Sequence, residues 1–249
     1  MAEKLNLIEH LSDKKKKQSY VTSMFETISS KYDFITKFLS YGMDGGWKRQ
    51  LVDMLKLQGH ERVLDLACGT GDITFAEAAK LPRGEAVGLD ITSGMIKIAN
   101  EKRAERGVTN AKFEIGDIMA IAHPDAAFEY VTGGYALRNV PDIPGALQEI
   151  KRVLKPGGRF FSLDFGHPPF KLYDWAYIKY LIIVGSITGI VLHGNADMYR
   201  YIPESLKRYP GQKGIVTLME QAGFTDCGYK QIAGGIMAIN WGTKPNTVN

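Results

Sequence analysis

Cysteine is scarce in this chain, and its scarcity excludes two kinds of protein. Only two cysteines, Cys68 and Cys227, occur among 249 residues. They cannot form the disulfide framework of a small secreted domain or the paired ligands of a structural zinc site. The five histidines show no paired spacing either, so we expect no metal site. This composition fits a reducing compartment, and we expect a cytoplasmic protein.

Long apolar runs and a strong net charge are also missing. The N-terminus has no apolar signal segment, so export is not expected. The least polar window, residues 180–192, is broken by glycine, serine and threonine and is too short to span a bilayer comfortably. The formal net charge of +4 is too small to indicate a nucleic-acid partner. No linker, repeat or low-complexity segment is visible, so we expect one globular domain with additions.

The most informative stretch joins an apolar strand to a helix through a glycine turn. The run Val63 to Ala67 ends at Gly69-Thr70-Gly71, and a helical pattern follows at once. This order opens a Rossmann-like unit, in which backbone approaches a ligand closely and a helix N-terminus faces it. The dinucleotide fingerprint needs a third glycine where Thr74 stands. Two glycines with an acid in the strand, Asp65, instead resemble motif I of the class I S-adenosylmethionine (SAM) methyltransferases.

The rest of the chain alternates between short apolar strands and helical patterns. Further strands are expected over residues 86–89, 111–115, 128–135, 159–165, 224–232 and 235–241. The last two are separated by a short turn at Ala233-Gly234, so they must be antiparallel. The pattern predicts an α/β fold with an otherwise parallel sheet that contains one reversed strand.

Acidic side chains stand where the second and third strands end. Asp90 is placed to accept both ribose hydroxyls of a nucleoside, and Thr92 or Ser93 is expected to cap the following helix. Asp117 and Ile118 follow the third strand. In this architecture they would meet the adenine amino group and the adenine ring.

Helical segments flank this core. Residues 1–56 are expected to form a helical lid, with an amphipathic helix over 24–39 and a second helix over 46–54, separated at 40–42 and by Gly45-Gly46. The run Lys14 to Lys17 is interpreted as a solvated helix face or frayed end in preference to a docking patch for anionic lipid. Residues 57–249 are expected to form the core, with a helical insertion over about 167–210. Its helix at 172–192 either covers the sheet, lines an apolar tunnel or rests on a bilayer.

Three further stretches resemble one family. They are Phe25 to Asp33 with Trp47-Lys-Arg49, then Leu137-Arg-Asn-Val-Pro-Asp142 with Lys155-Pro-Gly-Gly158, and finally Tyr199-Arg-Tyr-Ile-Pro-Glu-Ser-Leu206. Together they are similar to the ubiquinone/menaquinone biosynthesis C-methyltransferases of the UbiE/Coq5 type. The resemblance implies a Rossmann-like, seven-stranded class I SAM methyltransferase sheet. It also implies methyl transfer from SAM to a ring carbon of a polyprenylated quinol precursor.

The resemblance also implies functional positions. The SAM-binding positions are Asp65, Gly69, Thr70, Gly71, Asp90, Ile91, Asp117, Ile118 and Gly134. The catalytic positions are Arg138, Asn139 and Tyr32. Arg138 would stabilise a phenolate or polarise a water that accepts its proton, Asn139 would orient that water, and Tyr32 would contact the ring hydroxyl. Asp164 is a reserve base or a helix cap.

Three departures from the family pattern leave alternatives open. Glycine stands at position 134 where the family usually has serine, Thr36 replaces a common asparagine, and Asp44 replaces a common histidine. O-methylation of another phenol or amino transfer onto a quinone therefore remains an alternative. So do a nicotinamide-dependent oxidoreductase, a non-catalytic scaffold and, for Arg138, a surface salt bridge. The partners we expect are a lipophilic quinol, the inner face of a membrane, and either a second copy or a quinone-biosynthesis assembly.

Overall fold

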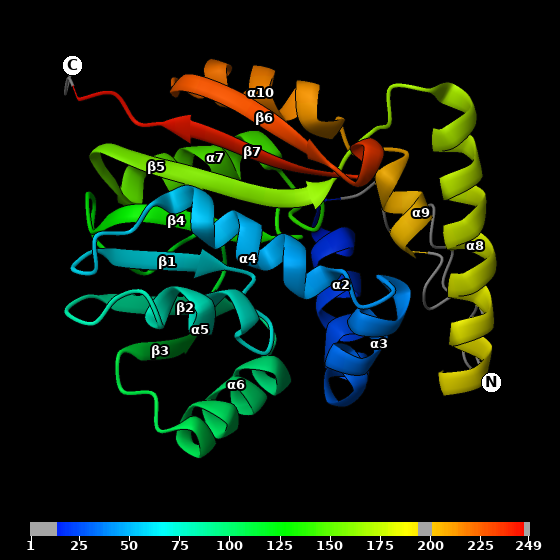
Figure 1. The fold of residues 1–249 in the computed structure, drawn as a ribbon, viewed down its shortest axis with the longest axis horizontal. Coiled ribbons are helices and arrows are strands. Elements are labelled where there is room, and N and C mark those ends of the chain that lie inside the picture. The colour runs from blue at the N-terminus through cyan, green and yellow to red at the C-terminus, as the bar shows by residue number, and fades with distance from the viewer. Residues whose placement is uncertain (1–13, 194–200, 247–249) are drawn as a thin grey trace.

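One mixed sheet organises the computed structural model, which describes residues 14–193 and 201–246 (Figure 1). The sheet has seven strands in the order β3-β2-β1-β4-β5-β7-β6. Their bounds are β1 (Arg62–Leu66), β2 (Glu85–Asp90), β3 (Ala111–Ile115), β4 (Phe128–Gly134), β5 (Leu154–Phe165), β6 (Thr225–Ile232) and β7 (Met237–Thr243). The first five strands pair in parallel, and β7 is antiparallel to both β5 and β6. The predicted α/β sheet with one reversed strand is confirmed.

The reversal of β7 follows from its short connection. Only the 3-10 turn η3 (Ala233–Gly235) joins β6 to β7, and a parallel pairing would need a crossover of a dozen or more residues. β7 inserts between β5 and β6 in the sheet.

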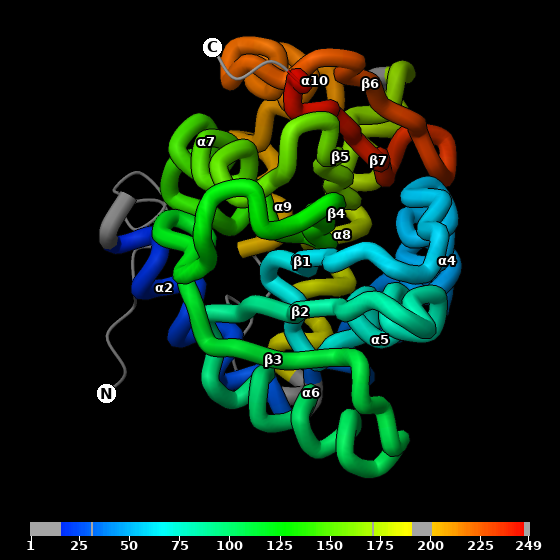
Figure 2. Tube along the Cα trace, turned by 90° about the vertical axis from the view of Figure 1, so that its left-hand side faces the viewer, coloured from blue at the N-terminus to red at the C-terminus, as the bar shows by residue number. Residues whose placement is uncertain are grey.

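Helices cover both faces of the sheet. Figure 2 shows α4 (Asp44–Leu55) and α5 (Asp72–Ala78) on one side and α7 (Ile143–Val153) on the other. The helix α6 (Ser93–Arg106) packs with the first group, and α10 (Gly211–Gln221) packs with α7. The alternation of side chains along β1 matches this arrangement, because Val63 joins one core cluster while Leu64 and Leu66 join the other. Burial on both faces explains why this strand reads as a continuous apolar run.

A second group of helices gathers at the carboxyl ends of the parallel strands, at the right of Figure 1. It contains α2 (Lys14–Ile28), η1 (Ser29–Lys31), α3 (Tyr32–Leu39), α8 (Lys171–His193) and α9 (Tyr201–Leu206). No helix within residues 14–193 and 201–246 is long and apolar enough to cross a membrane. Residues 1–13 of the expected lid and residues 194–200 of the expected insertion, including Tyr199 of the third motif, lie outside the described residues.

Two details of the N-terminal prediction are wrong. The single helix expected over residues 24–39 is interrupted by η1. The pair Gly45-Gly46 does not break the chain but lies inside α4, which begins at Asp44. Packing accounts for the second difference. Three residues of α4, Leu51, Val52 and Leu55, are at most 1% exposed, and their burial outweighs the roughly 1 kcal/mol that each glycine costs a helix.

Candidate active site

The glycine turn after β1 packs differently from a dinucleotide-binding turn. Thr74, which occupies the position of the third glycine, is fully buried, and its hydroxyl donates to Asp65 Oδ2 at 2.7 Å. The space for this side chain comes from Gly88 on β2, where a Cβ would lie 2.8 Å from Thr74 Oγ1. The close approach of helix to strand is therefore achieved by a glycine on the neighbouring strand.

Asp65 belongs to a buried acidic cluster beneath this turn. The Thr132 hydroxyl donates to Glu77 Oε1 at 2.8 Å and lies 3.3 Å from Asp65 Oδ1. Asp65 and Glu77 are both 0% exposed. Burial raises the pKa of Asp65 to about 7 and that of Glu77 well above its usual value. Asp65 thus binds the hydroxyl groups of Thr74 and Thr132 inside the core.

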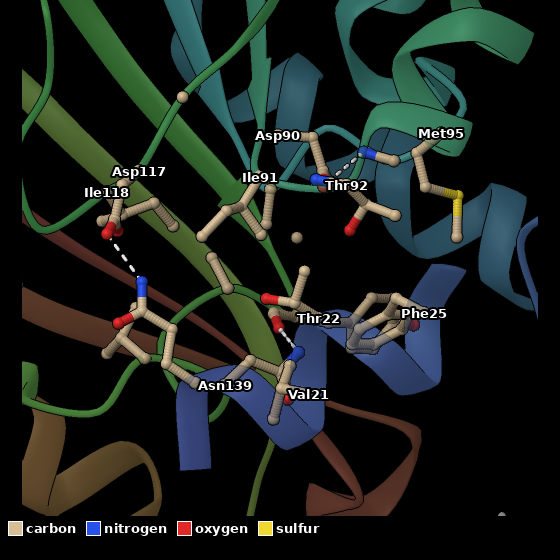
Figure 3. A pocket seen from close by; sticks show the side chains of 18 of the residues that line it. Val21, Thr22, Phe25, Asp90, Ile91, Thr92, Met95, Asp117, Ile118 and Asn139 are labelled. Carbon is tan, nitrogen blue, oxygen red and sulfur yellow. Dashed lines mark hydrogen bonds between the residues drawn. The ribbon is translucent and has the colours of Figure 1, made fainter. Parts of the chain in front are cut away.

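A pocket of about 720 Å³ lies beside the turn, at the carboxyl ends of β1, β2 and β4. Six of the nine predicted SAM-binding positions line it: Gly69, Asp90, Ile91, Asp117, Ile118 and Gly134. Figure 3 shows four of them facing Val21, Thr22 and Phe25 of α2. The other three positions, Asp65, Thr70 and Gly71, do not line the pocket.

Asp90 is held in place by the backbone around it. Its Oδ2 accepts a hydrogen bond from Gly69 N at 2.9 Å, and its Oδ1 accepts one from Thr92 N at 2.8 Å. The side chain is 9% exposed and borders the pocket. A carboxylate fixed in this way retains free lone pairs for ligand hydroxyl groups.

Asp117 lies on the opposite wall of the pocket and contacts α2. Its Oδ1 accepts a hydrogen bond from Met119 N at 2.9 Å, and its Oδ2 accepts one from Gln18 Nε2 at 2.6 Å. Gln18 also lines the pocket, although no local sequence pattern marks it as a site residue. Only the docking of α2 against the loop after β3 brings these two residues together.

A second pocket, of about 770 Å³, lies between the helices at the carboxyl edge and the ends of β4 and β5. Most of its walls are apolar or aromatic: Met24, Phe25, Ile28, Tyr32, Ile35, Leu39, Tyr135, Phe165, Tyr177, Leu181, Tyr201 and Ile202. Phe25, Tyr32 and Tyr135 line both pockets, so the two are neighbours. Arg138, Thr36 and Ser40 are the remaining residues that line the second pocket.

Arg138 is buried, with 8% of its surface exposed. Its Nε lies 3.0 Å from Asp164 Oδ1, although the N–H is not aligned for a hydrogen bond. Its Cζ lies 5.4 Å from the ring centre of Tyr135 and 5.1 Å from that of Phe165. Burial acts to lower the pKa of Arg138, but Asp164 together with the hydroxyls of Tyr201, Tyr32 and Tyr135 outweighs it, and the net pKa is raised. The surface-salt-bridge alternative is therefore wrong. Asp164 caps no helix, since α8 begins only at residue 171.

The neighbouring Asn139 is fixed by three hydrogen bonds. Its Nδ2 donates to the Tyr135 carbonyl at 2.7 Å, and its Oδ1 accepts from Arg138 Nη1 at 3.1 Å and from the Tyr201 hydroxyl at 2.8 Å. Tyr201 is completely buried. Asn139 thus links Arg138 to α9 and borders the first pocket.

Lys17 corrects the interpretation of the lysine run. Its Nζ donates to the carbonyl of Arg138 at 3.0 Å and to that of Val140 at 2.6 Å. Burial lowers the pKa of Lys17 to about 8. This lysine is no solvated side chain; it ties α2 to the loop that carries Arg138.

Tyr32, the third predicted catalytic residue, lies where the two pockets meet. Burial raises the pKa of its hydroxyl, while Lys48 and Arg138 act to lower it. The group is therefore a neutral phenol at ordinary pH. Of the predicted catalytic residues, Tyr32 and Arg138 face the second pocket and Tyr32 and Asn139 face the first.

The three departures from the family pattern have structural counterparts. Asp44 is 6% exposed and accepts a hydrogen bond from the Tyr135 hydroxyl at 2.6 Å, while Lys48 forms an ion pair with it at 2.5 Å. Thr36 lines the second pocket. At Gly134 a Cβ would lie 2.6 Å from Ile73 Cδ1, so the isoleucine fills the space of a serine side chain.

Two acidic residues of the N-terminal segment hold it against the core. Glu26 Oε1 accepts hydrogen bonds from the backbone and hydroxyl of Ser93 at 2.8 and 2.9 Å, and its Oε2 accepts one from Gly94 N at 3.2 Å. Thr92 makes no side-chain capping bond, so the expected cap is wrong and a residue of α2 replaces it. Asp33 accepts hydrogen bonds from the Thr70 hydroxyl and from Lys102 Nζ, each at 2.6 Å.

Comparisons with known proteins find relatives over most of the chain. Residues 13–244 match the model of the ubiE/COQ5 methyltransferase family. The chain is 37% identical over 235 residues to the ubiquinone/menaquinone biosynthesis C-methyltransferase UbiE of Proteus mirabilis, covering 93% of each chain. It is also 37% identical to the demethylmenaquinone methyltransferase of Thermus thermophilus, covering 89% of this chain and all of that one.

Solved structures share the fold. A SAM-dependent methyltransferase from Aquifex aeolicus superposes with a TM-score of 0.60 at 16% identity, over 79% of this chain and 89% of that one. A phosphoethanolamine N-methyltransferase from Haemonchus contortus in complex with SAM gives 0.59 at 14% identity, over 79% of this chain and 52% of that one.

Proposed function

Because the chain belongs to the ubiE/COQ5 methyltransferase family, we propose that it transfers a methyl group from SAM to a ring carbon of a lipophilic quinol. One observation carries this proposal: an acid-bearing pocket and an apolar pocket meet at Tyr32 and Tyr135, beside the buried Arg138. Such an arrangement separates a polar methyl donor from an apolar acceptor and leaves them a common wall.

The residues of the first pocket fit SAM. Asp90, oriented by two backbone N–H groups, would hold the ribose hydroxyls, and Asp117 with Ile118 would face the adenine. Bound there, SAM supplies an electrophilic methyl group on a sulfonium. The wall formed by Val21, Thr22 and Phe25 would exclude water from the donor.

The second pocket fits a quinol ring with part of an isoprenoid tail. Aromatic and aliphatic side chains from α2, α3, α8 and α9 would contact the tail, and Arg138 would meet a ring hydroxyl. The names of relatives at 37% identity support a quinol precursor as the acceptor. A lipophilic acceptor resides in a bilayer, so the proposal implies work at the cytoplasmic face of a membrane.

Methyl transfer to carbon requires the site to activate a ring carbon of the quinol. A neutral phenol is a weak carbon nucleophile, and its phenolate is a much better one, so the site must favour loss of the hydroxyl proton. Arg138 keeps its charge and would stabilise the phenolate oxygen from a nearly dry position, where such stabilisation is strong. Asn139 would orient the water that takes the proton, because its amide is already fixed by Tyr201 and by the Tyr135 carbonyl. Asp164 holds the guanidinium in place.

A direct test uses purified protein, SAM and reduced short-tail benzoquinols and naphthoquinols that lack one ring methyl. We expect a product heavier by one methylene that still reoxidises to a quinone, because a methyl on carbon leaves both hydroxyls free. A product that cannot be reoxidised would indicate O-methylation and replace this proposal. Retention of SAM without turnover of any quinol would favour the scaffold alternative.

A further inference from the structure

Large apolar side chains are exposed mainly in one region of the molecule. Eleven of the thirteen exposed large hydrophobic residues in the described parts of the chain lie in two segments. The first is residues 34–43, with Phe34, Phe38, Tyr41 and Met43. The second is residues 170–190, with Phe170, Leu172, Tyr173, Trp175, Ile183, Ile187 and Ile190. Scattered exposed hydrophobic residues are ordinary, but a concentration of this kind marks an interaction surface.

The two segments adjoin each other at the carboxyl edge of the sheet. Tyr41, at the end of the first segment, stacks on Tyr180 of α8 with ring centres 5.7 Å apart. Figure 1 shows α8 at the outer edge of the molecule, with α3 beside its lower half. We call the eleven side chains the apolar edge.

The helix α8 is apolar on two faces with different surroundings. Its inner face contributes Tyr177 and Leu181 to the second pocket. Its outer face carries exposed residues three or four positions apart, which places them on one side of the helix: Leu172, Trp175, Lys179, Ile183, Ile187 and Ile190. With 23 residues, α8 is about 34 Å long. The outer stripe and the wall of the pocket that we assign to the acceptor thus lie on opposite sides of one helix.

We propose that the apolar edge docks on the surface of an anionic lipid bilayer, with α8 and α3 lying in the plane of the interface. The proposal rests on the proposed function, since a bilayer-dissolved quinol explains why the stripe and the pocket share one helix. No described helix could span the bilayer, so the contact is interfacial.

Charge and aromatic content favour lipid as the occupant. The Lys179 ammonium lies 5.9 Å from the centre of the Trp175 ring. Both side chains have an apolar body and a polar end, which suits the headgroup region of a bilayer. The exposed lysine of α3, Lys37, lies between Phe34 and Phe38 in sequence. The carboxylates of α3 and α8 contact residues outside the apolar edge. Asp33 accepts hydrogen bonds from Thr70 and Lys102, and Asp174 lies 3.7 Å from His167 Nδ1. The lysines would attract anionic headgroups, and the apolar side chains beside them would contact the acyl chains.

The test is co-sedimentation of the full chain with vesicles of phosphatidylcholine, with and without phosphatidylglycerol. The variant Ile183→Ser/Ile187→Ser removes two side chains that are 58% and 56% exposed and line neither pocket. We expect its vesicle partition coefficient to fall about tenfold, because two isoleucine side chains that are half inserted in the bilayer are lost. Lys37→Glu/Lys179→Glu should remove the preference for phosphatidylglycerol. Ile115→Ser, which removes an isoleucine that is 63% exposed on the far strand β3, should bind vesicles like the parent.

Vesicle binding is measured without substrate, so its result is separate from that of the methyl-transfer assay. Both variants should methylate a short-tail acceptor in solution at the parental rate, which shows that they are folded. Absence of vesicle binding by the parent protein would overturn the proposal, as would equal losses in the Ile115→Ser control. So would a parent dimer that the Ile183→Ser/Ile187→Ser change converts to a monomer with unchanged partitioning, because the stripe would then be an interface between copies.

Discussion

At the scale of single residues, replacing Arg138 should have the largest effect on the rate of methyl transfer. The Arg138→Ala variant should lower the single-turnover rate by about 10²–10³-fold, the usual loss when a buried group that stabilises developing negative charge is removed. SAM affinity should stay within a few-fold, because Arg138 does not line the first pocket. Arg138→Lys should also be slow, since the ammonium lacks the fork geometry that reaches Asn139 and Asp164 together. Higher pH should partly rescue Arg138→Ala by ionising the phenol in bulk solvent.

A matched control is Arg159→Ala. Arg159 lies over the Phe161 ring at 4.7 Å, as Arg138 lies over Tyr135, but it lines neither pocket. Its removal should leave the rate near the parental value. A rate for Arg138→Ala that equals the rate for Arg159→Ala would contradict the proposed role.

Gly134 gives a second prediction at this scale. The Gly134→Ser variant restores the residue usual in the family, but its Cβ would lie 2.6 Å from Ile73 Cδ1. We expect a destabilisation of at most about 1.5 kcal/mol, because the clashing atom is the free end of the Ile73 side chain and can move at the cost of a strained torsion. Ile73→Val removes that methyl group, so the double variant should recover most of the loss, which thermal unfolding of all four proteins would measure. If Ile73→Val brings no recovery, the contact does not explain the glycine.

The residues found from sequence and those missed differ in one physical respect. Asp90 is the last residue of β2 and Asp117 follows the end of β3 by two residues, so a local pattern places both at the carboxyl edge. Lys17, Gln18 and Glu26 act through hydrogen bonds to residues 67 to 123 positions away. Nothing local marks such partners, because their roles depend on how α2 docks.

At the scale of elements, α2 is the part whose position matters most. It forms one wall of the first pocket and is tied to three separate parts of the core: Lys17 binds the loop after β4, Gln18 binds the loop after β3, and Glu26 binds the start of α6. Since α2 covers the pocket, we propose that α2 and α3 act as a lid that opens for ligand exchange.

The Glu26 contact gives the prediction for this lid. Glu26→Ala removes the carboxylate that caps α6, so amide exchange should accelerate at Ser93 and Gly94 and along α2. SAM should also dissociate faster, because one of the ties of the lid is lost. Hydrogen exchange and stopped-flow release of SAM would measure both effects.

The control for this experiment is Glu101→Ala on α6, the helix that Glu26 caps. Glu101 is exposed and its carboxylate lies 4.0 Å from the Lys97 ammonium. The substitution therefore removes a carboxylate of α6 that forms no ion pair with the described side chains of α2. Equal exchange along α2 in the two variants would show that Glu26 does not hold the lid.

The strands were easier to predict than the N-terminal helices, for a physical reason. A strand buried on both faces reads as a short apolar run, as β1 and β2 do, while β3 at the edge of the sheet alternates between buried and exposed residues. The helices at the carboxyl edge pack on pockets and on one another. Their glycine pair and the 3-10 turn η1 therefore depend on contacts that the local sequence does not contain.

At the scale of the whole molecule, the order of elements was predictable and the pockets were not. The β–α alternation and the short turn before β7 are enough for the sheet. The second pocket takes its walls from α2, α3, α8, α9 and the ends of β4 and β5. Only the assembled fold brings residues as distant as Met24 and Ile202 onto one cavity.

Global stability should depend on the acidic cluster beneath the glycine turn. Asp65 and Glu77 are both fully buried and share the Thr132 hydroxyl, and Glu77 Oε2 has no hydrogen-bond partner. Burial raises the pKa of Asp65 to about 7 and also raises that of Glu77. Between their unfolded pKa values, near 4, and these raised values, the folded chain binds more protons than the unfolded chain. Stability contributed by this cluster therefore falls as pH rises through that window.

The variant Glu77→Gln should consequently be more stable than the parent at pH 8 and gain little at pH 5. The amide keeps an oxygen for the Thr132 hydroxyl, removes one buried charge and relieves the repulsion on Asp65. A gain of about 1 kcal/mol would raise the Tm by roughly 2–4 °C in a chain of this size.

Glu61→Gln provides a control of opposite sign. Burial acts to raise the pKa of Glu61, but the backbone N–H groups of Gln58, Gly59 and His60 bond its carboxylate and hold the pKa below its usual value. This carboxylate contributes stability above its unfolded pKa and loses it as pH falls, so Glu61→Gln should lower the Tm at pH 8. Thermal unfolding of the parent and both variants at the two pH values would decide. A Tm for Glu77→Gln at pH 8 at or below the parental value would mean that the buried pair does not limit stability, and that Thr132 and Thr74 compensate both carboxylates fully.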